Sequence, residues 1–326
     1  MSKQFRIKRT YSQIAVVAGG FATIDLPRGY DYETLYLRIN GTVQVTTAFT
    51  SVRAEAPCQV VSRVEVIADG RNTLFSAPFW FTAFGSYDRA GALANGARVT
   101  TPPSGAAIAS YAVEAVGTVD FMNVDGERTK DSNFRTDGLQ LFQLRLTFGN
   151  PGDMFVGAGV AAYTTMSVEI TTTETVELPD AQGARTNPAA LKKTSYQEIA
   201  IPSTNANQEV RLPAGNMIKS VVVRTEGVST AGEPQIGALN NLQVFSGVDV
   251  RHNVKSGSIR ALNNADYGYI LPGYYIVDLA RNGSPGSHLS ELWDVTQQAE
   301  PKISMDITAG AAVKAQVVTT EFLALA

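Results

Sequence analysis

The sequence is poor in the residues that carry chemistry, with one cysteine, Cys58, and two histidines, His252 and His288, in 326 residues. A single cysteine excludes an intramolecular disulfide, so the fold does not depend on an oxidising compartment. We expect Cys58 to be a small buried side chain. Each histidine stands alone, whereas metal sites need several ligands at close spacing, so we expect both at the surface or in loops. With no P-loop and no Gly-x-Ser-x-Gly motif, the sequence predicts no enzyme and no catalytic, cofactor or metal site.

Charge and long apolar runs are scarce too. Charged residues make up 17% of the chain, against about 25% in a typical globular domain, which favours a subunit of a large assembly. There is no run of 18 apolar residues and no apolar stretch of signal-peptide type, so we expect synthesis and folding in the cytoplasm. The net charge of −3 gives no reason to expect sequence-specific binding of nucleic acid.

The charge is unevenly distributed. Four basic residues and no acidic one stand in the first 24 positions, namely Lys3, Arg6, Lys8 and Arg9. Because the whole chain carries −3 and this segment +4, the remainder carries −7. We interpret residues 1–20 as a basic N-terminal arm. Three roles stay open for it: a solvated tail, contact with phosphates of lipid headgroups or nucleic acid, and packing against a neighbouring subunit.

Most of the remaining sequence alternates apolar and polar residues with a period of two, the pattern of β-strands with one buried face. The clearest segments are residues 34–39, 63–67, 139–148, 167–178, 219–224 and 302–307. Helical periodicity is rare, and the best candidates are short helices at 77–89 and 256–266. The sequence therefore predicts an all-β protein with short helices in its loops.

An internal repeat divides the chain. Leu26-Pro27-Arg28-Gly29 recurs as Leu212-Pro213-Ala214-Gly215, and without a gap Arg38 then corresponds to Arg224 and Gly41 to Gly227. Later matches keep the same order: residues 64–67 with 242–245, 144–148 with 303–307, and 172–174 with 319–321. Residues 90–116, rich in Gly, Ala, Ser and Pro, explain much of the extra length of the first copy as an exposed loop. We expect the arm at 1–20, a first sandwich at 21–180, a linker at 181–195 and a second sandwich at 196–326.

Three clusters have both a structural and a functional interpretation. An acidic group between apolar segments is best explained as a solvated loop, with structural Ca²⁺ or acid–base chemistry as alternatives: Asp120, Asp125, Glu127, Asp131 and Asp137. The aromatic run at 79–84 indicates a short helix packed under a sheet, or else a ligand platform. Four tyrosines, Tyr267, Tyr269, Tyr274 and Tyr275, indicate subunit contacts or the edge of the core, because tyrosine has an apolar ring and a polar tip.

The second copy carries the residues of a family resemblance. They are Leu212 to Gly215 entering a strand, Gly273 to Leu279, and Leu289 to Asp294 ahead of the strand at 302. With two consecutive eight-stranded jelly rolls and a short basic arm, the chain resembles the double jelly-roll major capsid proteins of tailless, icosahedral, membrane-containing bacteriophages (tectiviruses, corticoviruses and finnlakeviruses). The resemblance covers nearly the whole chain.

The resemblance implies a non-enzymatic homotrimer of pseudo-hexagonal outline that tiles the virion shell and is assembled in the host cytoplasm. It also implies contacts with neighbouring trimers and with minor capsid and vertex proteins. Residues 90–116 would face outward, and the arm would face inward, toward an internal membrane or a neighbouring trimer. Two other hypotheses stay open. The first is that the chain is a viral spike, adhesin or lectin built from two sandwiches. The second is that it is an enzyme with a metal or a carboxylate pair in a pocket.

Overall fold

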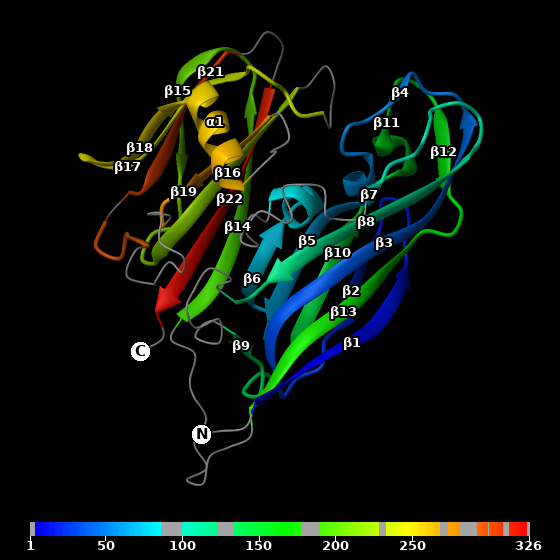
Figure 1. Ribbon diagram of the computed structural model, residues 1–326, viewed down its shortest axis with the longest axis horizontal. Helices are drawn as coiled ribbons and strands as arrows, with labels where there is room; N and C mark the ends of the chain where they lie inside the picture. The colour runs from blue at the N-terminus through cyan, green and yellow to red at the C-terminus, as the bar shows by residue number, and fades with distance from the viewer. Residues whose placement is uncertain are drawn as a thin grey trace.

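The computed structural model describes residues 4–85, 100–122, 133–177, 190–227, 233–267, 273–280, 292–298, 300–308 and 313–324. These residues form two β-sandwiches that lie side by side (Figure 1). Each sandwich consists of two sheets that enclose apolar side chains, as the alternating sequence pattern predicts.

The first sandwich is built from strands of the N-terminal half. One sheet has the order β1 (Gln4–Ala15), β13 (Ser167–Glu177), β3 (Asp31–Thr47) and β8 (Ser110–Asp120). The other has the order β2 (Phe21–Asp25), β10 (Phe142–Phe148), β5 (Val61–Ala68) and β6 (Asn72–Ala77). Short strands β7 (Thr100–Thr101), β9 (Phe134–Arg135) and β12 (Val160–Tyr163) extend the first sheet, while β4 (Ser51–Val52) pairs with β11 (Phe155–Val156). Two 3₁₀ turns, η1 (Ala56–Gln59) and η4 (Pro151–Met154), lie in the loops.

The second sandwich repeats this arrangement. One sheet has the order β14 (Ala190–Ile201), β22 (Val313–Ala324), β16 (Met217–Gly227) and β19 (Tyr274–Asp278). The other has the order β15 (Asn205–Arg211), β21 (Lys302–Ile307), β17 (Leu239–Ser246) and β18 (Asp249–Lys255). The short β20 (Trp293–Asp294) pairs with β16, and α1 (Ser256–Tyr267) follows β18.

Both sandwiches have the same strand order. Each sandwich has eight main strands, counted along the chain without the short strands β4, β7, β9, β11, β12 and β20. In each sandwich, the first, eighth, third and sixth main strands form one sheet, and the second, seventh, fourth and fifth form the other. This is the eight-stranded jelly roll, and the neighbouring strands within each sandwich are antiparallel. The prediction of two consecutive jelly rolls from the internal repeat is therefore confirmed.

The structure draws the domain boundaries differently from the sequence interpretation. Residues 4–15 are not a separate arm, because β1 pairs with β13 over its whole length. Likewise, residues 190–195 are not linker, because they begin β14, which pairs with β22. The first jelly roll therefore begins at β1 and the second at β14, 186 residues later (190 − 4). Residues 1–3 and 181–189 lie outside the described part.

The loop and helix predictions are confirmed in part. Residues 110–116, expected in an exposed loop, belong to β8, while 90–99 lie outside the described residues. Between 77 and 89, the structure shows one helical turn, η2 (Phe81–Gly85), after β6, and residues 86–89 are not described. The helix expected at 256–266 is α1. None of the described helices is long and apolar enough to cross a membrane.

Two apolar clusters form the cores. The larger one fills the first jelly roll and includes Leu35, Leu37 and Ile39 from β3, facing Leu144 and other residues of the opposite sheet. The second fills the other jelly roll. The larger cluster also takes in side chains of the second jelly roll, so the first core continues across the boundary between the two.

Candidate functional site: the junction between the jelly rolls

The two jelly rolls meet edge to edge. Thr194 of β14 lies opposite Phe75 of β6 in a parallel bridge. This contact joins a sheet of the first jelly roll to a sheet of the second, so that a nine-stranded sheet runs through both (Figure 1). The shared sheet fixes how one sandwich is placed against the other.

Strand β16 is buried on both of its faces. Its alternate residues Val221 and Val223 belong to the core of the second jelly roll, whereas Val222 belongs to the cluster of the first. Val318 and Ile276 from the neighbouring strands join Val222 there. A strand covered on both sides has an apolar run in place of alternation, which explains the three consecutive valines.

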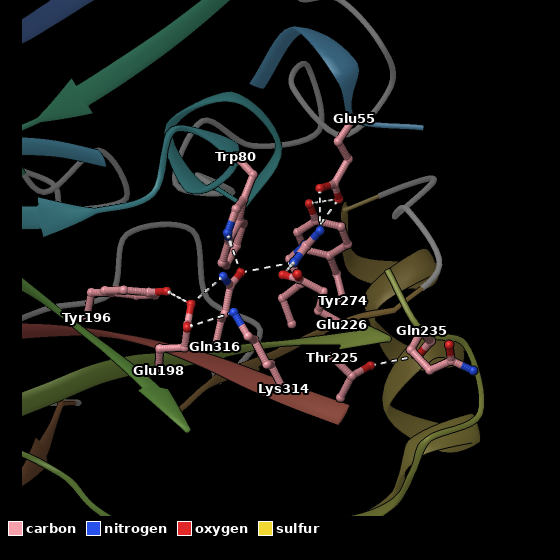
Figure 2. A network of polar contacts seen from close by, with 11 residues as sticks. Glu55, Trp80, Tyr196, Glu198, Thr225, Glu226, Gln235, Tyr274, Lys314 and Gln316 are labelled. Carbon is pink, nitrogen blue, oxygen red and sulfur yellow. Dashed lines mark hydrogen bonds and ion pairs between the residues drawn. The ribbon is translucent and has the colours of Figure 1, made fainter. Parts of the chain in front are cut away.

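Arg224 follows these valines and is buried at the junction, with 1% of its side chain exposed. Its Nη2 and Nε donate to the two carboxylate oxygens of Glu55, at 2.7 and 3.3 Å. Its Nη1 donates to Glu226 Oε2 at 2.8 Å. The Tyr274 hydroxyl also donates to Glu55. Because Glu55 precedes η1 of the first jelly roll and Arg224 lies on β16, the ion pair crosses the junction (Figure 2).

The charges of this pair depend on each other. Burial raises the pKa of Glu55, and the Arg224 guanidinium opposes this shift. Burial by itself would lower the pKa of Arg224. The Glu55 carboxylate beside it raises that pKa by more than burial lowers it, so the net shift is upward and the arginine stays charged. Burial likewise raises the pKa of Tyr274, which remains a neutral hydrogen-bond donor. A fully buried carboxylate is stable here because a paired cation and a hydroxyl compensate it.

A chain of hydrogen bonds leads from the ion pair to the surface. Gln316 Oε1 accepts from Arg224 at 3.0 Å and from the Trp80 indole at 2.8 Å. Gln316 Nε2 then donates to Glu198 at 3.1 Å, and Lys314 pairs with the same carboxylate at 3.1 Å (Figure 2). Trp80 belongs to the first jelly roll, so its hydrogen bond to Gln316 is a second polar contact across the junction. At the rim, the Ala54 amide donates to Glu233 at 3.1 Å.

This arrangement is suited to fixing the relative orientation of the two jelly rolls rather than to catalysing a reaction. The polar groups are packed against each other and hydrogen-bonded, and the described residues include no group of three His, Cys, Asp or Glu side chains placed to hold a metal ion. A buried, directional ion pair inside an apolar boundary allows few relative orientations of its two sides. We therefore regard the junction as the element that sets the geometry of the whole molecule.

Comparison with known proteins shows which fold has this arrangement. No family model and no curated protein matches the sequence. Among solved structures, the major capsid protein of STIV (the Sulfolobus Turreted Icosahedral Virus) aligns over 98% of this chain and 97% of its own, at TM-score 0.74 and 17% identity. The major capsid protein P2 of bacteriophage PM2 aligns over 99% and 98%, at TM-score 0.61 and 14% identity. The capsid protein in the PBCV-1 virus model aligns over 99% and 94%, at TM-score 0.63 and 13% identity.

The chain has the double jelly-roll fold of these capsid proteins.

In the double jelly roll, the basic residues near the N-terminus have partners within the chain. Arg6 Nε donates to Glu33 at 2.6 Å, and Arg9 Nη2 donates to Glu174 at 3.0 Å. The Lys8 ammonium lies 4.3 Å from the centre of the Tyr36 ring. Lys3 is outside the described residues. Arg6, Lys8 and Arg9 are therefore spread along β1 with separate partners, and they do not form a free basic cluster.

The tyrosines expected at subunit contacts are instead buried inside the chain. Tyr267 and Tyr274 belong to the cluster of the first jelly roll, and Tyr275 belongs to that of the second. At most 4% of any of the three is exposed, so they offer no surface to another subunit. Of the two expected roles, a place in the core therefore holds for these three and subunit contact is wrong. The first jelly roll covers Tyr267 and Tyr274, whereas Tyr275 packs in the core of its own jelly roll. Tyr269 lies outside the described part.

Most of the other residues considered as candidate sites are packed or hydrogen-bonded within the fold. Cys58 is buried and free, as expected. Asp120 is buried on β8 and accepts from the Thr34 hydroxyl at 2.9 Å, so it is not part of a solvated loop. His252 is half-buried on β18, and burial lowers its pKa. Phe79, Trp80 and Phe81 are buried around the turn after β6, as expected for a packed helical segment. Residues without a structural description here are Asp125, Glu127, Asp131 and His288.

The sequence alone does not mark the junction residues as a site. The internal repeat singles out Arg224 only as the counterpart of Arg38, and no sequence pattern marks Glu55 or Gln316. One signal was present. A charged residue directly after Val221-Val222-Val223 indicates a strand with both faces covered, and a charge there needs a buried partner. The identity of that partner, 169 residues away in sequence, has no local signature.

Proposed function

We propose that this protein is the major capsid subunit of an icosahedral virus, and that it has no enzymatic activity. The observation that supports this most strongly is the alignment of both jelly rolls together, over 98% of the chain, with a major capsid protein. Alignment of one sandwich alone would support only a common β-fold. Here the two jelly rolls align together as one unit.

The geometry also suits tiling. Each chain contributes two similar sandwiches held at a fixed angle by the shared sheet and the buried ion pair. Three chains around a threefold axis would present six similar wedges, which gives a nearly hexagonal block that packs into flat facets. Obligate interfaces of this kind bury thousands of square ångströms, which agrees with a low content of charged residues.

The finer parts of the hypothesis stay predictions. These are the bacteriophage host, assembly in the host cytoplasm, contacts with minor capsid and vertex proteins, and contact with an internal membrane. The membrane contact of residues 1–20 would have to involve the exposed side chains of β1 within its sheet. A spike or lectin would be expected to present an exposed aromatic cluster, and Tyr274 and Tyr275, the described tyrosines after α1, are buried.

The proposal predicts that the purified protein is a trimer. Light scattering or sedimentation should give a particle mass three times the 34.8 kDa of one chain, independent of dilution over the micromolar range. Dissociated virus-like particles should give the same species. A mass of one chain at the highest soluble concentration would contradict the proposal.

A further inference from the structure

Strand β19 lies at one end of the nine-stranded sheet, and among the strands that the structure describes it pairs only with β16. In an antiparallel pair, every second residue bonds the partner strand. Gly273 O accepts from Thr225 at 3.1 Å, and Leu279 N donates to Lys219 at 2.8 Å, so the odd-numbered residues bond β16. The amide and carbonyl of Ile276 therefore point away from β16. An open edge of this kind is a template for a strand of another molecule.

The side chain of Asn263, on α1, occupies this edge. Its Nδ2 donates to the Ile276 carbonyl at 2.8 Å, and its Oδ1 accepts from the Ile276 amide at 2.9 Å. A pairing strand would bond the same two backbone groups. Because a carboxamide carries a donor and an acceptor, as a peptide group does, Asn263 takes the place of one residue of a neighbouring strand. Only 4% of Asn263 is exposed.

Helix α1 holds Asn263 between two anchors. Its buried residues are Ile259, Asn263 and Tyr267, which are spaced four apart and share one face of the helix. Ile259 packs in the core of the second jelly roll, whereas Tyr267 packs in the cluster of the first. The Tyr267 hydroxyl also donates to Asp278 at the end of β19, at 3.2 Å. The helix is therefore fixed along the edge of β19, with the carboxamide of Asn263 directed at Ile276.

Asparagine is an unfavourable residue for this position by every local measure. It is a weak helix former, and burial of a polar side chain is costly unless its hydrogen bonds are made. An apolar residue between Ile259 and Tyr267 would suit both the helix and the buried face. A residue that contradicts its local surroundings indicates a particular role. At Asn263, that role lies in the two bonds to Ile276.

The opposite end of the same sheet is covered in a related way. The end strand there is β2, and the Leu26 amide donates to Phe142 at 2.8 Å, so the carbonyl of Asp25 points away from β10. The Tyr11 hydroxyl donates to that carbonyl at 2.8 Å. Both β2 and β19 have five residues, and short end strands are a further protection against pairing between molecules. Side chains thus bond outward backbone groups at both ends of the sheet.

We propose that Asn263 closes the edge of β19 and thereby prevents β19 of a second copy from pairing with it. The pairing that it prevents is antiparallel around Ile276, with Tyr274 opposite Asp278 of the second copy. The backbone of these three residues faces outward, so the edge is complementary to itself once Asn263 no longer occupies it. The role does not depend on the proposed capsid function, because it concerns a contact that the folded protein avoids.

Two substitutions separate edge closure from stability. Asn263→Ala and Asn263→Lys both remove the bonds to Ile276, and alanine and lysine are both good helix formers. They differ at the opened edge, because a lysine there opposes strand pairing. At about half the urea concentration of the unfolding midpoint, Asn263→Ala should form a species at least about twice the wild-type mass by sedimentation velocity. Asn263→Lys should keep the wild-type mass in the same urea.

Hydrogen exchange at the Ile276 amide follows the edge directly. In freshly prepared Asn263→Ala and Asn263→Lys, this amide should exchange about tenfold faster than in the wild type or more, because its buried acceptor is lost. In the associated Asn263→Ala species, exchange should slow again. The matched control is Asn253→Ala on β18. Asn253 is exposed and accepts from the Asn241 side chain, so its loss should change neither the mass nor the exchange at Ile276.

Two results would overturn the proposal. One is an Asn263→Ala protein that keeps the wild-type mass although its Ile276 amide exchanges rapidly. The other is an Asn263→Lys protein that associates as much as Asn263→Ala, because association would then follow from lost stability. The wild-type chain gives the same test if Asn263→Ala does not fold. Its association in rising urea should begin where exchange at Ile276 accelerates, and association that precedes this acceleration would contradict the proposal.

Discussion

Arg224→Ala is expected to lower the free energy of unfolding by about 3–5 kcal/mol, because removing one partner of a buried ion pair leaves the other charge uncompensated. The substitution leaves the Glu55 carboxylate fully buried, with only the Tyr274 hydroxyl to compensate it. It also removes the donor that Glu226 and Gln316 share. Urea unfolding followed by tryptophan fluorescence measures the effect, and Trp80 reports on the junction directly because its indole belongs to the same network.

The control for this experiment is another arginine in a salt bridge. Arg211 pairs with Glu300 at 3.4 Å but is 78% exposed, so Arg211→Ala should change the free energy of unfolding by at most about 0.5 kcal/mol. The two substitutions remove the same side chain and differ in burial and partners. If Arg224→Ala costs less than about 1 kcal/mol, the ion pair does not hold the two jelly rolls together.

Deletion of residues 1–15 is expected to prevent folding of the first jelly roll. The deletion removes β1, whose loss uncovers the whole edge of β13 and breaks the contact of Arg9 with the buried Glu174. It also removes Ile14, which packs against the core. A domain is stable by only about 5–15 kcal/mol in total, and the loss of one of eight core strands exceeds such a margin. Expression and solubility, followed by circular dichroism of any soluble fraction, measure the result.

The matched control deletes only residues 1–3, which precede β1. This shorter deletion should leave a soluble protein that unfolds cooperatively at the same urea concentration as the full chain. A removable arm would behave differently. If the chain without residues 1–15 is soluble and unfolds cooperatively, then β1 is dispensable and the interpretation of residues 1–20 as a separate arm is correct after all.

The sequence predicted the double jelly roll because two signals agreed, the period of two in the strands and the ordered repeat. It did not predict that residues 4–15 and 190–201 are the first strands of their jelly rolls. In both segments, basic residues interrupt the apolar positions, at Lys8-Arg9 and Lys192-Lys193, and a run of charge resembles a solvated tail. Extending the ungapped offset of 186 backward from Leu26 would have aligned the two segments and identified both as strands.

The junction could not be predicted in the same way, because burial there depends on a neighbour distant in sequence. Tyr274 and Tyr275 look alike in the sequence, yet one faces the first jelly roll and the other faces the core of the second. Glu55 lies in a loop segment whose local pattern suggests exposure, and it becomes fully buried only when β16 is placed against it. Local periodicity identifies which face of a strand is apolar, but not which domain covers the outer face.

Electron microscopy of the purified, assembled protein tests the central claim most directly. Averaged views along the symmetry axis should show a threefold particle with six wedges of nearly equal size, each the width of one jelly roll, and such particles should pack edge to edge in shells or sheets. Images of isolated two-lobed molecules, or of an assembly without threefold symmetry, would contradict the claim that the two joined jelly rolls form the building block of a capsid.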